Sequence, residues 1–482
     1  MAWAVSTAPM TQPFSAIVLA AGQGTRMKSA LPKVLHHAAG IAMLDHVVRA
    51  AIAAGAREVV VVVGHGRDQV TEHLRARFGD QVHTAVQEEQ KGTGHAVQCA
   101  MGALEGLRGD VVILSGDVPL LEANAVAQLL EVRRRDYGMK LALLTAELPD
   151  PTGYGRILRD ERGSVLGIRE HKDASTAERT IKEWNAGSYA VELAFLRRSL
   201  TQLRTENAQG ELYLTDVVAM ASQDGGAEGL RWSAESVMGV NDRSQLAIVD
   251  AILRERIATR WAQSGVTIRG LRSVFIDADV VVEPDATLEP GVHLRGKTIV
   301  RGSARIDVGC VLTDVEVHEG AYLKPYTIAE KSSIGPRAQI GPFSHLRPDT
   351  LLAEDTHVGN FVETKKTSMG KGSKANHLAY LGDGKIGEGV NVGAGTIFCN
   401  YDGFRKHTTT LEDGAFIGSD SQLVAPITIG KGAYVGTGTT VTRDVPADAL
   451  AISRTKQENK EGYASRLKSR MQALAAADKK KA

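Results

Sequence analysis

The sequence predicts a helix-covered, mainly parallel α/β sheet in the first half of the chain and a parallel β-helix in the second half. Two observations indicate the sheet: short apolar runs alternate with helix-compatible stretches, and a glycine-containing loop follows the first run. One observation indicates the β-helix: an aliphatic residue returns at every sixth position over three runs. Neither an amphipathic helix nor an ordinary strand has that period.

Length, charge and cysteine content exclude several classes of protein. The chain has 482 residues, which is long for one hydrophobic core and suggests two or three domains. A formal net charge of +1 gives no bulk attraction to nucleic acid or to an anionic membrane. Its three cysteines, Cys99, Cys310 and Cys399, lack CxxC spacing, which argues against a disulfide framework and fits a reducing cytoplasm.

No targeting or membrane segment is predicted. Residues 1–13 carry no Lys or Arg and no long apolar core, so we expect a disordered N-terminal extension and not a signal peptide. No stretch of the sequence approaches the apolar length of a membrane span. We therefore expect a cytoplasmic protein without membrane insertion and without a nucleic-acid partner.

The first half alternates between two kinds of segment. Four apolar runs have the composition of buried strands, at residues 15–20, 58–63, 110–114 and 140–144. Helix-compatible stretches occur between them, as at residues 42–54 and 124–135. This alternation predicts a mainly parallel sheet whose ligands bind at the carboxyl ends of the strands.

The loop after the first run contains Gly22 and Gly24. Met27 stands where a dinucleotide fingerprint has its third glycine, and the loop lacks the Gly-Lys-Ser/Thr of a Walker A motif. The two glycines alone fit a structural strand-to-helix turn equally well. Arg26 and Lys33 favour a functional interpretation, because cations beside freed backbone N–H groups form a cradle for a triphosphate.

Residues 243–264 join the two halves. Their apolar residues recur at helical spacing, which predicts a connecting helix with one face docked on a neighbour. These residues are Leu246, Val249, Leu253, Ile257 and Trp261.

The sixth-residue repeat fills most of the second half. Its three runs are Ile276, Val282, Leu288, Leu294, Val300, Ile306 and Leu312; Ile334, Ile340, Leu346, Leu352 and Val358; and Ile417, Leu423, Ile429, Val435 and Val441. Small or β-branched residues follow at the expected corners: Ala286, Ala304, Ala338, Ser344, Thr350, Ala433 and Thr439. Accidental spacing in a Val-rich β-sandwich is the alternative, and three runs of one period argue against it.

The regular steps break after Val362 and, for longer, over residues 398–415. Insertions in a stacked repeat map to loops, often on the binding face, so we expect chemistry at both breaks. After Arg454 the Lys-, Glu- and Ala-rich tail is expected to be a partly helical, solvated arm without chemistry.

Specific segments carry a family resemblance. Residues 19–27 read LAAGQGTRM and precede Leu31-Pro32-Lys33, which resembles the nucleotidyltransferase signature of sugar-phosphate pyrophosphorylases. Further matching segments are Gln87, Gly92-Thr93-Gly94-His95, Ser115-Gly116-Asp117, Gly153-Tyr154-Gly155-Arg156, Glu170-His171-Lys172-Asp173, Asn185 and Gly239-Val240-Asn241. Together with the repeat, residues 14–454 resemble the bacterial family of bifunctional N-acetylglucosamine-1-phosphate uridylyltransferases and glucosamine-1-phosphate acetyltransferases.

The resemblance implies an α/β nucleotidyltransferase domain with a Rossmann-like, mainly parallel sheet, followed by a left-handed parallel β-helix of hexapeptide repeats. We accordingly expect a uridylyltransferase domain over residues 14–242, a linker helix over 243–265, an acetyltransferase β-helix over 266–455 and a tail over 456–482. The family also implies a homotrimer with active sites between neighbouring subunits. The spacing of the repeat by itself shows neither the handedness nor the trimer.

By the same resemblance, the chain is expected to catalyse two steps of UDP-N-acetylglucosamine biosynthesis, which supplies bacterial peptidoglycan and lipopolysaccharide. The second domain acetylates glucosamine-1-phosphate with acetyl-CoA, and the first then transfers UMP from UTP to N-acetylglucosamine-1-phosphate and releases pyrophosphate. The alternative is a monofunctional sugar-nucleotide pyrophosphorylase with a non-catalytic, oligomerising β-helix. A third interpretation is a non-enzymatic assembly scaffold.

The chemistry of uridylyl transfer agrees with the residue types. A sugar 1-phosphate is already anionic near neutrality and needs no general base, so the cations Arg26 and Lys33 should dominate catalysis. Magnesium is the remaining requirement and takes few protein oxygens, because it keeps its waters. Asp117 and Asn241 match the family's metal ligands, although Asp117 alone would be a turn or helix-cap residue.

Further uridylyltransferase residues follow from the resemblance. The uracil and ribose positions are Leu19, Ala20, Ala21, Gly22, Gln87, Gly92 and Thr93, and the N-acetylglucosamine positions are Gly155, Glu170 and Asn185. Lys33, Ser115, Gly116, Asp117 and Asn241 complete the set. Ser115 departs from the family's usual Tyr, and Arg169 is an unusual charge beside Glu170.

Amine acetylation needs a base, because a sugar amine is largely protonated near neutrality. Histidine has a suitable pKa, and His377 matches the family's base, although a lone histidine would more often be structural. The sugar-phosphate positions implied by the resemblance are Arg347, Lys365, Tyr380 and Asn391, which would otherwise count as solvated surface residues. The implied acetyl-CoA positions are Ala394, Asn400, Tyr401, Ser419, Thr437 and Arg454, with Thr437 replacing a common Ala.

Overall fold

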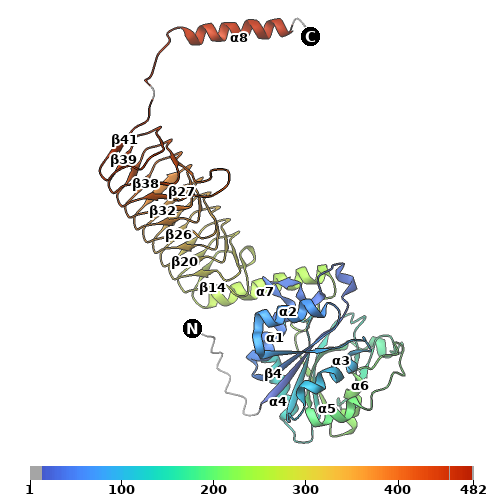
Figure 1. The fold of residues 1–482 in the computed structure, drawn as a ribbon. Coiled ribbons are helices and arrows are strands. Elements are labelled where there is room, and N and C mark those ends of the chain that lie inside the picture. The colour runs from blue at the N-terminus through green and yellow to red at the C-terminus, as the bar shows by residue number, and fades with distance from the viewer. Residues whose placement is uncertain (1–12, 455, 480–482) are drawn as a thin grey trace. The chain divides into compact units, whose positions relative to one another are not determined.

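The computed structural model describes residues 13–454 and 456–479. The chain forms two compact units: residues 1–261 with 275–279, and residues 262–274 with 280–482. The disordered extension expected at the N-terminus falls on residues outside the described part, apart from Pro13. Each unit is considered by itself below (Figure 1).

The first unit is built on one twisted sheet with the strand order β11-β7-β10-β6-β1-β4-β5. All neighbours are parallel except β10, which runs antiparallel to β6 and β7. The strands are β1 (Phe14–Ala20), β4 (Ala56–Val63), β5 (Val82–Val86), β6 (Asp110–Ser115), β7 (Leu141–Glu147), β10 (Glu183–Glu192) and β11 (Ala227–Arg231), with the side hairpin β8 (Arg156–Arg159) and β9 (Val165–Arg169). The predicted mainly parallel sheet is confirmed.

Helices cover both faces of this sheet (Figure 1). Alternate residues of β1 take part in two separate cores, Val18 in one and Ile17 in the other. The first core is closed by α1 (Met43–Ala53), α2 (Arg67–Phe78) and α4 (Ala123–Arg134). The second is closed by α3 (Thr93–Ala100), α5 (Leu193–Leu200) and α6 (Asp216–Gln223). The predicted segments lie within a few residues of these bounds, because their apolar periodicity is strong.

The predicted connecting helix is α7 (Arg243–Gln263). Val249, Leu253, Ile257 and Trp261 are buried, so one face docks as expected. The guanidinium of Arg256 donates to the carbonyl oxygen of Leu120, which fixes the helix to the rest of the first unit.

The second unit is a left-handed parallel β-helix of three sheets, which we call faces 1, 2 and 3. Face 1 comprises β12 (Thr267–Ile268), β15 (Thr287–Leu288), β18 (Arg305–Ile306), β21 (Tyr322–Leu323), β24 (Gln339–Ile340), β27 (His357–Asn360), β30 (Lys374–His377), β33 (Asn391–Val392), β36 (Phe416–Ile417), β39 (Tyr434–Val435) and β41 (Leu450–Ala451). Face 2 comprises β16 (His293–Arg295), β19 (Val311–Thr313), β22 (Ile328–Glu330), β25 (His345–Leu346), β28 (Glu363–Lys365), β31 (Tyr380–Gly382), β34 (Ile397–Cys399), β37 (Gln422–Val424) and β40 (Thr440–Val441). Face 3 comprises β14 (Val281–Val282), β17 (Ile299–Val300), β20 (Glu316–Val317), β23 (Ser333–Ile334), β26 (Leu351–Leu352), β29 (Ser368–Met369), β32 (Gly384–Ile386), β35 (Thr409–Leu411) and β38 (Ile427–Ile429).

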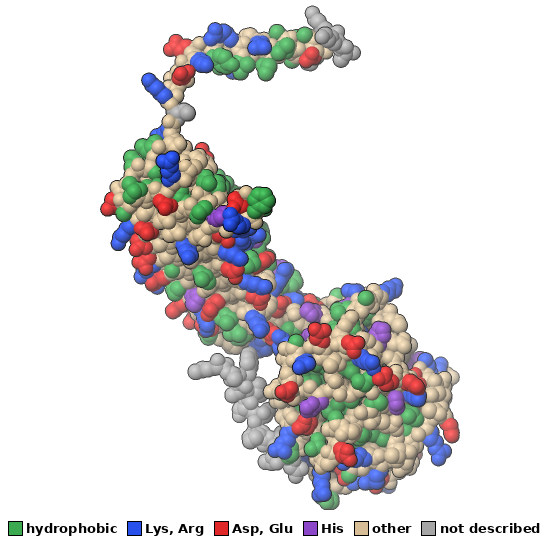
Figure 2. All heavy atoms as spheres, in the orientation of Figure 1, with side chains coloured by type: hydrophobic (Ala, Val, Ile, Leu, Met, Phe, Trp, Pro, Cys, Tyr) green, Lys and Arg blue, Asp and Glu red, His purple; other side chains and the backbone are tan. Residues whose placement is uncertain are grey.

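Every aliphatic residue of the three predicted runs is buried inside the prism. The small residues at the corners are buried as well. Two of the polar ones donate to backbone carbonyl oxygens, Thr350 to Arg347 O at 2.7 Å and Ser344 to Gly359 O at 2.6 Å. The hexapeptide architecture is therefore confirmed. Acidic and basic side chains are interspersed on the surface drawn in Figure 2, in keeping with the balanced net charge.

The predicted break after Val362 is wrong, because the coils continue through it. Thr364, Met369, Ala375 and Leu381 occupy the next inward positions and are buried. Thr364 and Ala375 stand where most other coils have Val, Ile or Leu, so a search for large aliphatic residues misses the repeat here. The second break is real: the chain leaves the prism between β34 and β35 and forms a loop closed by a bridge between Tyr401 and Lys406.

The described part of the tail contains one helix, α8 (Tyr463–Lys479), whose described side chains are exposed, as a solvated arm requires. Among the described residues, no helix combines the length and apolarity needed to cross a bilayer.

Candidate active sites

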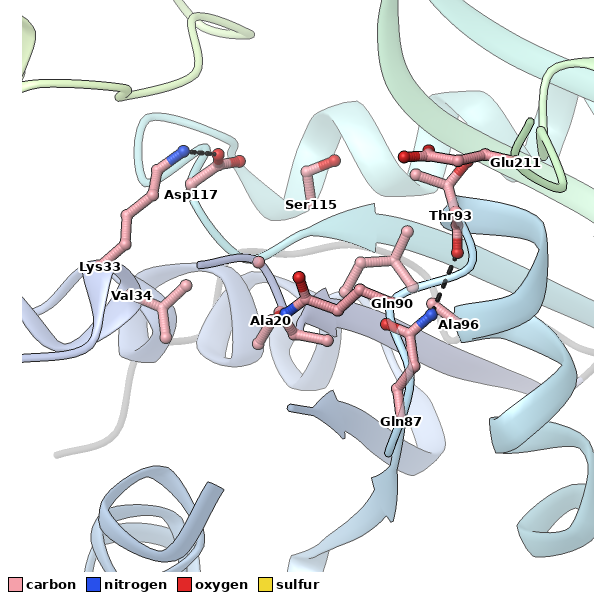
Figure 3. Close-up of a pocket in the computed structure, with 14 residues that line it drawn as sticks. Ala20, Lys33, Val34, Gln87, Gln90, Thr93, Ala96, Ser115, Asp117 and Glu211 are labelled. Carbon is pink, nitrogen blue, oxygen red and sulfur yellow. Dashed lines mark hydrogen bonds and ion pairs between the residues drawn. The ribbon is translucent and has the colours of Figure 1, made fainter. Parts of the chain in front are cut away.

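A cavity of about 330 Å³ opens at the carboxyl ends of β1, β5 and β6, where a parallel sheet places ligands (Figure 3). Ten of the predicted uridylyltransferase residues line it: Leu19, Ala20, Ala21, Gly22, Lys33, Gln87, Gly92, Thr93, Ser115 and Asp117. Four lining residues were not predicted: Val34, Gln90, Ala96 and Glu211. The amide of Gln90 lies close to Gln87 in sequence and could have been noticed, whereas Glu211 carries no local signal.

The predicted cations and metal ligands converge beside this cavity from distant parts of the chain. Lys33 Nζ lies 2.5 Å from Asp117 Oδ2 and 3.3 Å from Asn241 Oδ1 (Figure 3 shows the first contact). Arg26 Nη2 donates to the same Asn241 oxygen at 2.8 Å. The backbone holds the group together, since Val240 N donates to the carbonyl oxygen of Asp117 at 2.9 Å. Two cationic side chains and the two side chains predicted as metal ligands therefore lie in contact beside the cavity.

The predicted sugar residues form a neighbouring group. Asn185 N donates to the carbonyl oxygen of Gly155 at 2.9 Å. A Cβ on Gly155 would lie 2.7 Å from an Ile168 methyl, so only glycine leaves room there. Its distance to the Glu170 carboxylate oxygens would be 3.6 Å, which brings the three predicted residues together.

The Glu170 carboxyl is an unusual acid. Burial raises its pKa, and the nearby carboxylates of Asp173 and Asp216 act in the same direction, while a hydrogen bond from Thr215 Oγ1 opposes them. The guanidinium of the adjacent Arg169 binds Glu178 at 3.1 Å. A carboxyl with a raised pKa keeps its proton to a higher pH, and the protonated form can both donate to and accept from a sugar.

In the β-helix, the predicted base and four of the six residues predicted for acetyl-CoA form one column along the corner between faces 1 and 2, here corner 1–2. From coil to coil the column contains His377, Ala394, Ser419, Thr437 and Arg454. The backbone amide of Asp420 donates to Ala394 O, and that of Gly438 donates to Ser419 O. Arg454 Nε donates to Thr437 O at 3.1 Å.

His377 stands at the lower end of this column with an exposed ring. Its Nδ1 lies 3.0 Å from Asn360 Oδ1, in the coil below. An amide oxygen only accepts, so Nδ1 carries the proton and Nε2 keeps a free lone pair. The ring is thus held in the tautomer that a general base needs. Asn391 is on face 1 of the next coil, paired with Lys374.

The remaining acetyltransferase residues gather near the corner between faces 2 and 3, here corner 2–3. Lys365 Nζ lies 3.3 Å from Asp383 Oδ2, and Asn400 Nδ2 donates to the same oxygen at 2.5 Å. A Cβ on Gly382 would lie 2.5 Å from the Tyr380 hydroxyl and 2.6 Å from Asn400 Nδ2, so glycine keeps this cluster compact. Asp383 was missed because it looks like any corner aspartate.

Two further predicted residues lie beside this cluster. Arg347 pairs with Glu363 at 2.8 Å on face 2, next to Tyr380. Tyr401 extends into the inserted loop, and its hydroxyl donates to Gly403 O. Burial raises the pKa of the Cys399 thiol, which makes it a poor nucleophile. One prism therefore presents acetyltransferase residues at two corners with face 2 between them.

Comparison with known proteins decides the family. A MobA-like NTP transferase domain matches residues 16–180, and a hexapeptide repeat of succinyl-transferase matches residues 408–443. The protein named bifunctional protein GlmU from Sorangium cellulosum is 61% identical over 463 residues, covering 95% of this chain and 98% of that protein. The chain belongs to the GlmU family.

Other GlmU proteins are similar over the same extent. Those of Pelobacter propionicus and Thermobifida fusca are 48% and 45% identical and span 94% and 98% of this chain. With both domain types present, the chain is a bifunctional enzyme, a uridylyltransferase and a glucosamine-1-phosphate acetyltransferase. GlmU-type nucleotide-sugar transfer typically uses a divalent metal. The monofunctional and scaffold interpretations are thereby set aside.

Proposed function

We propose that the first unit binds UTP in the 330 Å³ cavity and N-acetylglucosamine-1-phosphate in the adjoining Gly155–Glu170–Asn185 pocket. The glycine loop offers its backbone N–H groups to the phosphates, and Arg26 and Lys33 neutralise the charge that builds up during transfer. The sugar phosphate attacks the α-phosphorus directly, and pyrophosphate leaves. The observation that carries this proposal is the convergence of Arg26, Lys33, Asp117 and Asn241 on one point beside the cavity.

Magnesium is the metal we propose for this site. Asp117 and Asn241 fit it, because a carboxylate and an amide oxygen converge there and leave the other positions for waters and phosphate oxygens. When bound, the ion would neutralise the phosphates and align them. Lys33 would then move from Asp117 toward the phosphates it is placed to bind.

In the second unit, His377 Nε2 takes a proton from the amine of glucosamine-1-phosphate, and the nitrogen lone pair attacks the thioester carbonyl of acetyl-CoA. The C–S bond breaks, and CoA leaves as the thiol with a proton returned from the His377 imidazolium. Asn360 keeps the ring in the required tautomer. Arg347 and Lys365 hold the phosphate, and Tyr380 and Asn391 hold the sugar. Acetyl-CoA extends along the corner 1–2 column. Acetylation precedes uridylyl transfer, since the second reaction uses the N-acetylated sugar.

A homotrimer completes the acetyltransferase site in this proposal. Corner 1–2 of one prism and corner 2–3 of another together supply the predicted residues other than Asn391, which lies on face 1. The side chains at corner 1–2 support the homotrimer. In four successive coils, the residue at this corner has a left-handed backbone and a large apolar side chain. These are Tyr326, Phe343, Phe361 and Leu378, with φ of 59°, 55°, 58° and 48°.

We call these four residues the corner ladder. They are 53%, 49%, 57% and 59% exposed, and the three aromatic rings stack at centroid distances of 5.4 and 5.6 Å. The other two corners use Asp, Lys, Ser, Arg or Gly at the same position, for example Asp349 and Ser303. Bulky residues are unfavourable with left-handed backbone and apolar ones are unfavourable in water, so the corner ladder fits a covered interface between copies.

We retain the functional division predicted above, with uridylyl transfer over residues 14–242, a linker over 243–265, acetyl transfer over 266–455 and a tail over 456–482. A cytoplasmic location fits the reducing environment that three unpaired cysteines favour.

The decisive experiment assays both reactions on the full chain. We expect CoA thiol release from acetyl-CoA with glucosamine-1-phosphate, and pyrophosphate release from UTP with N-acetylglucosamine-1-phosphate that stops on magnesium chelation. A chain that releases pyrophosphate but no thiol would refute the proposed acetyltransferase site.

A further inference from the structure

The amide of Gln87, a residue proposed to contact uracil, is held in one orientation by two neighbours. Its Nε2 lies 3.1 Å from the carbonyl oxygen of Gly92 and 3.1 Å from His95 Nδ1. A carbonyl oxygen can only accept, so the nitrogen and not the oxygen of the amide must lie on that side. The two N–H groups of Nε2 then serve the two partners, and His95 Nδ1 is the acceptor of the second.

The surroundings of the other His95 ring nitrogen, Nε2, are consistent with Nδ1 acting as the acceptor. If Nδ1 accepts, the neutral ring carries its proton on Nε2, and Nε2 lies 3.8 Å from the Cys99 sulfur one helical turn later. Helix α3 fixes both residues, and Gly92 precedes it with φ of 101°. The Gln87 backbone is fixed as well, because its N–H donates to Val63 O at 2.8 Å.

The oxygen of the Gln87 amide consequently faces the other way. Gln87 is only 5% exposed and lines the cavity, and Figure 3 shows its oxygen turned from the dashed contact toward Ala20 and Gln90. Within the described part of the chain, Oε1 accepts no hydrogen bond. A hydrogen-bond acceptor is therefore presented, already oriented, where the base is proposed to bind.

We propose that His95 is a positioning residue that sets the base selectivity of uridylyl transfer by fixing the Gln87 amide. Uracil presents a donor at N3–H, which the fixed Oε1 accepts. Cytosine presents a bare acceptor at N3, which the same oxygen repels. Thymine keeps N3–H and is not distinguished at this point. This inference rests on the proposed uridylyltransferase function and names the residue behind its choice of nucleotide.

Two substitutions separate hydrogen bonding from packing. His95→Phe keeps the ring volume and removes the acceptor. His95→Asn loses the ring volume but can place Oδ1 where Nδ1 was, so it still accepts from Gln87. The measurement is kcat/KM for UTP, CTP and dTTP with N-acetylglucosamine-1-phosphate, by pyrophosphate release. Acetyl transfer in the same samples reports an intact chain, and Gln98→Ala, whose amide donates to Leu200 O and not to His95, is the control on the same helix.

In His95→Phe we expect the UTP-to-CTP ratio to fall about tenfold, since one of two contacts holding the amide is lost. The UTP-to-dTTP ratio should stay constant, and the loss for UTP should lie mainly in KM. His95→Asn should keep most of the UTP-to-CTP ratio, and Gln98→Ala all of it.

If His95 acted only by packing, His95→Phe would keep the UTP-to-CTP ratio and His95→Asn would lose it. That result would overturn the inference. The inference would also be overturned if kcat/KM for UTP and for dTTP fell equally, relative to kcat/KM for CTP, in His95→Asn. This outcome can be measured even if the His95→Phe variant does not fold. Failure of the proposed function is distinguishable, because the unmodified enzyme would then release no pyrophosphate from any of the three nucleotides.

Discussion

At the scale of single residues, the two active sites rely on side chains whose state is set by one neighbour. His377 is the clearest case, since Asn360 leaves its Nε2 free to take a proton. We expect His377→Ala to lower acetyl transfer by about 10²- to 10⁴-fold and to leave uridylyl transfer unchanged, as measured by thiol and pyrophosphate release. His318→Ala, a histidine away from both corners of the site, is the matched control. Equal loss of both activities would count against two separate sites.

Glu170 provides a prediction about pH and stability. Its pKa is raised in the folded state, chiefly by burial, so the folded protein binds this proton more tightly than the unfolded chain. At a pH above the Glu170 pKa in the folded protein, the ionised carboxylate therefore destabilises the fold. This destabilisation disappears below pH 4.5, the pKa of the same carboxyl in the unfolded chain.

Glu170→Gln should accordingly raise the unfolding temperature of the first unit at neutral pH, with a gain that shrinks as the pH falls toward 4.5. Glutamine can still accept from Thr215, so the hydrogen bond at 3.0 Å survives. Thermal unfolding at several pH values measures the difference. A gain that grows on acidification would contradict the raised pKa. The same variant should weaken sugar binding, which appears as a higher KM.

Much of the residue-level picture was predictable because family motifs mark it. Ten of the motif residues of the first unit line one cavity, although composition alone could not have joined Asp117 to Asn241 across the chain. Asp383 and Asn360 escaped prediction for a physical reason. Each looks like an ordinary turn or strand residue, and only the coil register brings it beside Lys365 or His377.

At the scale of elements, the corner ladder is the feature with the sharpest consequence. Phe343→Gly removes a ring and relieves a left-handed φ of 55°, so it should not weaken an isolated prism. We expect it to shift the sedimentation equilibrium toward smaller species, with about tenfold or greater loss of acetyl transfer at low protein concentration. Ser303→Gly relieves a φ of 59° at the corner between faces 3 and 1, away from both corners of the site, and should leave assembly unchanged.

An unaltered molecular mass in Phe343→Gly, and in a Phe343→Gly, Phe361→Gly double variant, would show that the corner ladder is not the interface. Recovery of acetyl transfer at higher protein concentration would support it, because mass action restores a weakened assembly.

The elements themselves were predicted unevenly. Long apolar runs such as residues 58–63 were placed well, since burial on both faces of a parallel sheet leaves a continuous signal. The coils after Val362 were misjudged, because Thr364 and Ala375 fill inward positions without looking hydrophobic. The antiparallel course of β10 had no signal either, since strand direction depends on distant partners.

At the scale of the whole molecule, two reactions in series reside on one chain but use separate residues. We expect Asp117→Ala to abolish uridylyl transfer and His377→Ala to abolish acetyl transfer. An equimolar mixture of the two variants should restore conversion of glucosamine-1-phosphate to UDP-N-acetylglucosamine, with a lag while the N-acetylated intermediate accumulates. Chromatography of the sugar nucleotide over time tests this. A mixture that stays inactive would mean that the intermediate never leaves the chain on which it forms.

The three-faced stack also has a consequence for how such proteins diversify. Each turn of the prism pairs only with the turn before and the turn after it, as Leu288 does with Ile306 and Ile306 with Leu323. Relatives can therefore gain or lose entire turns below the acetyl-transfer centre at little cost, whereas a fraction of a turn would rotate every later side chain onto the wrong wall. Length differences among natural versions of this prism should come in whole turns.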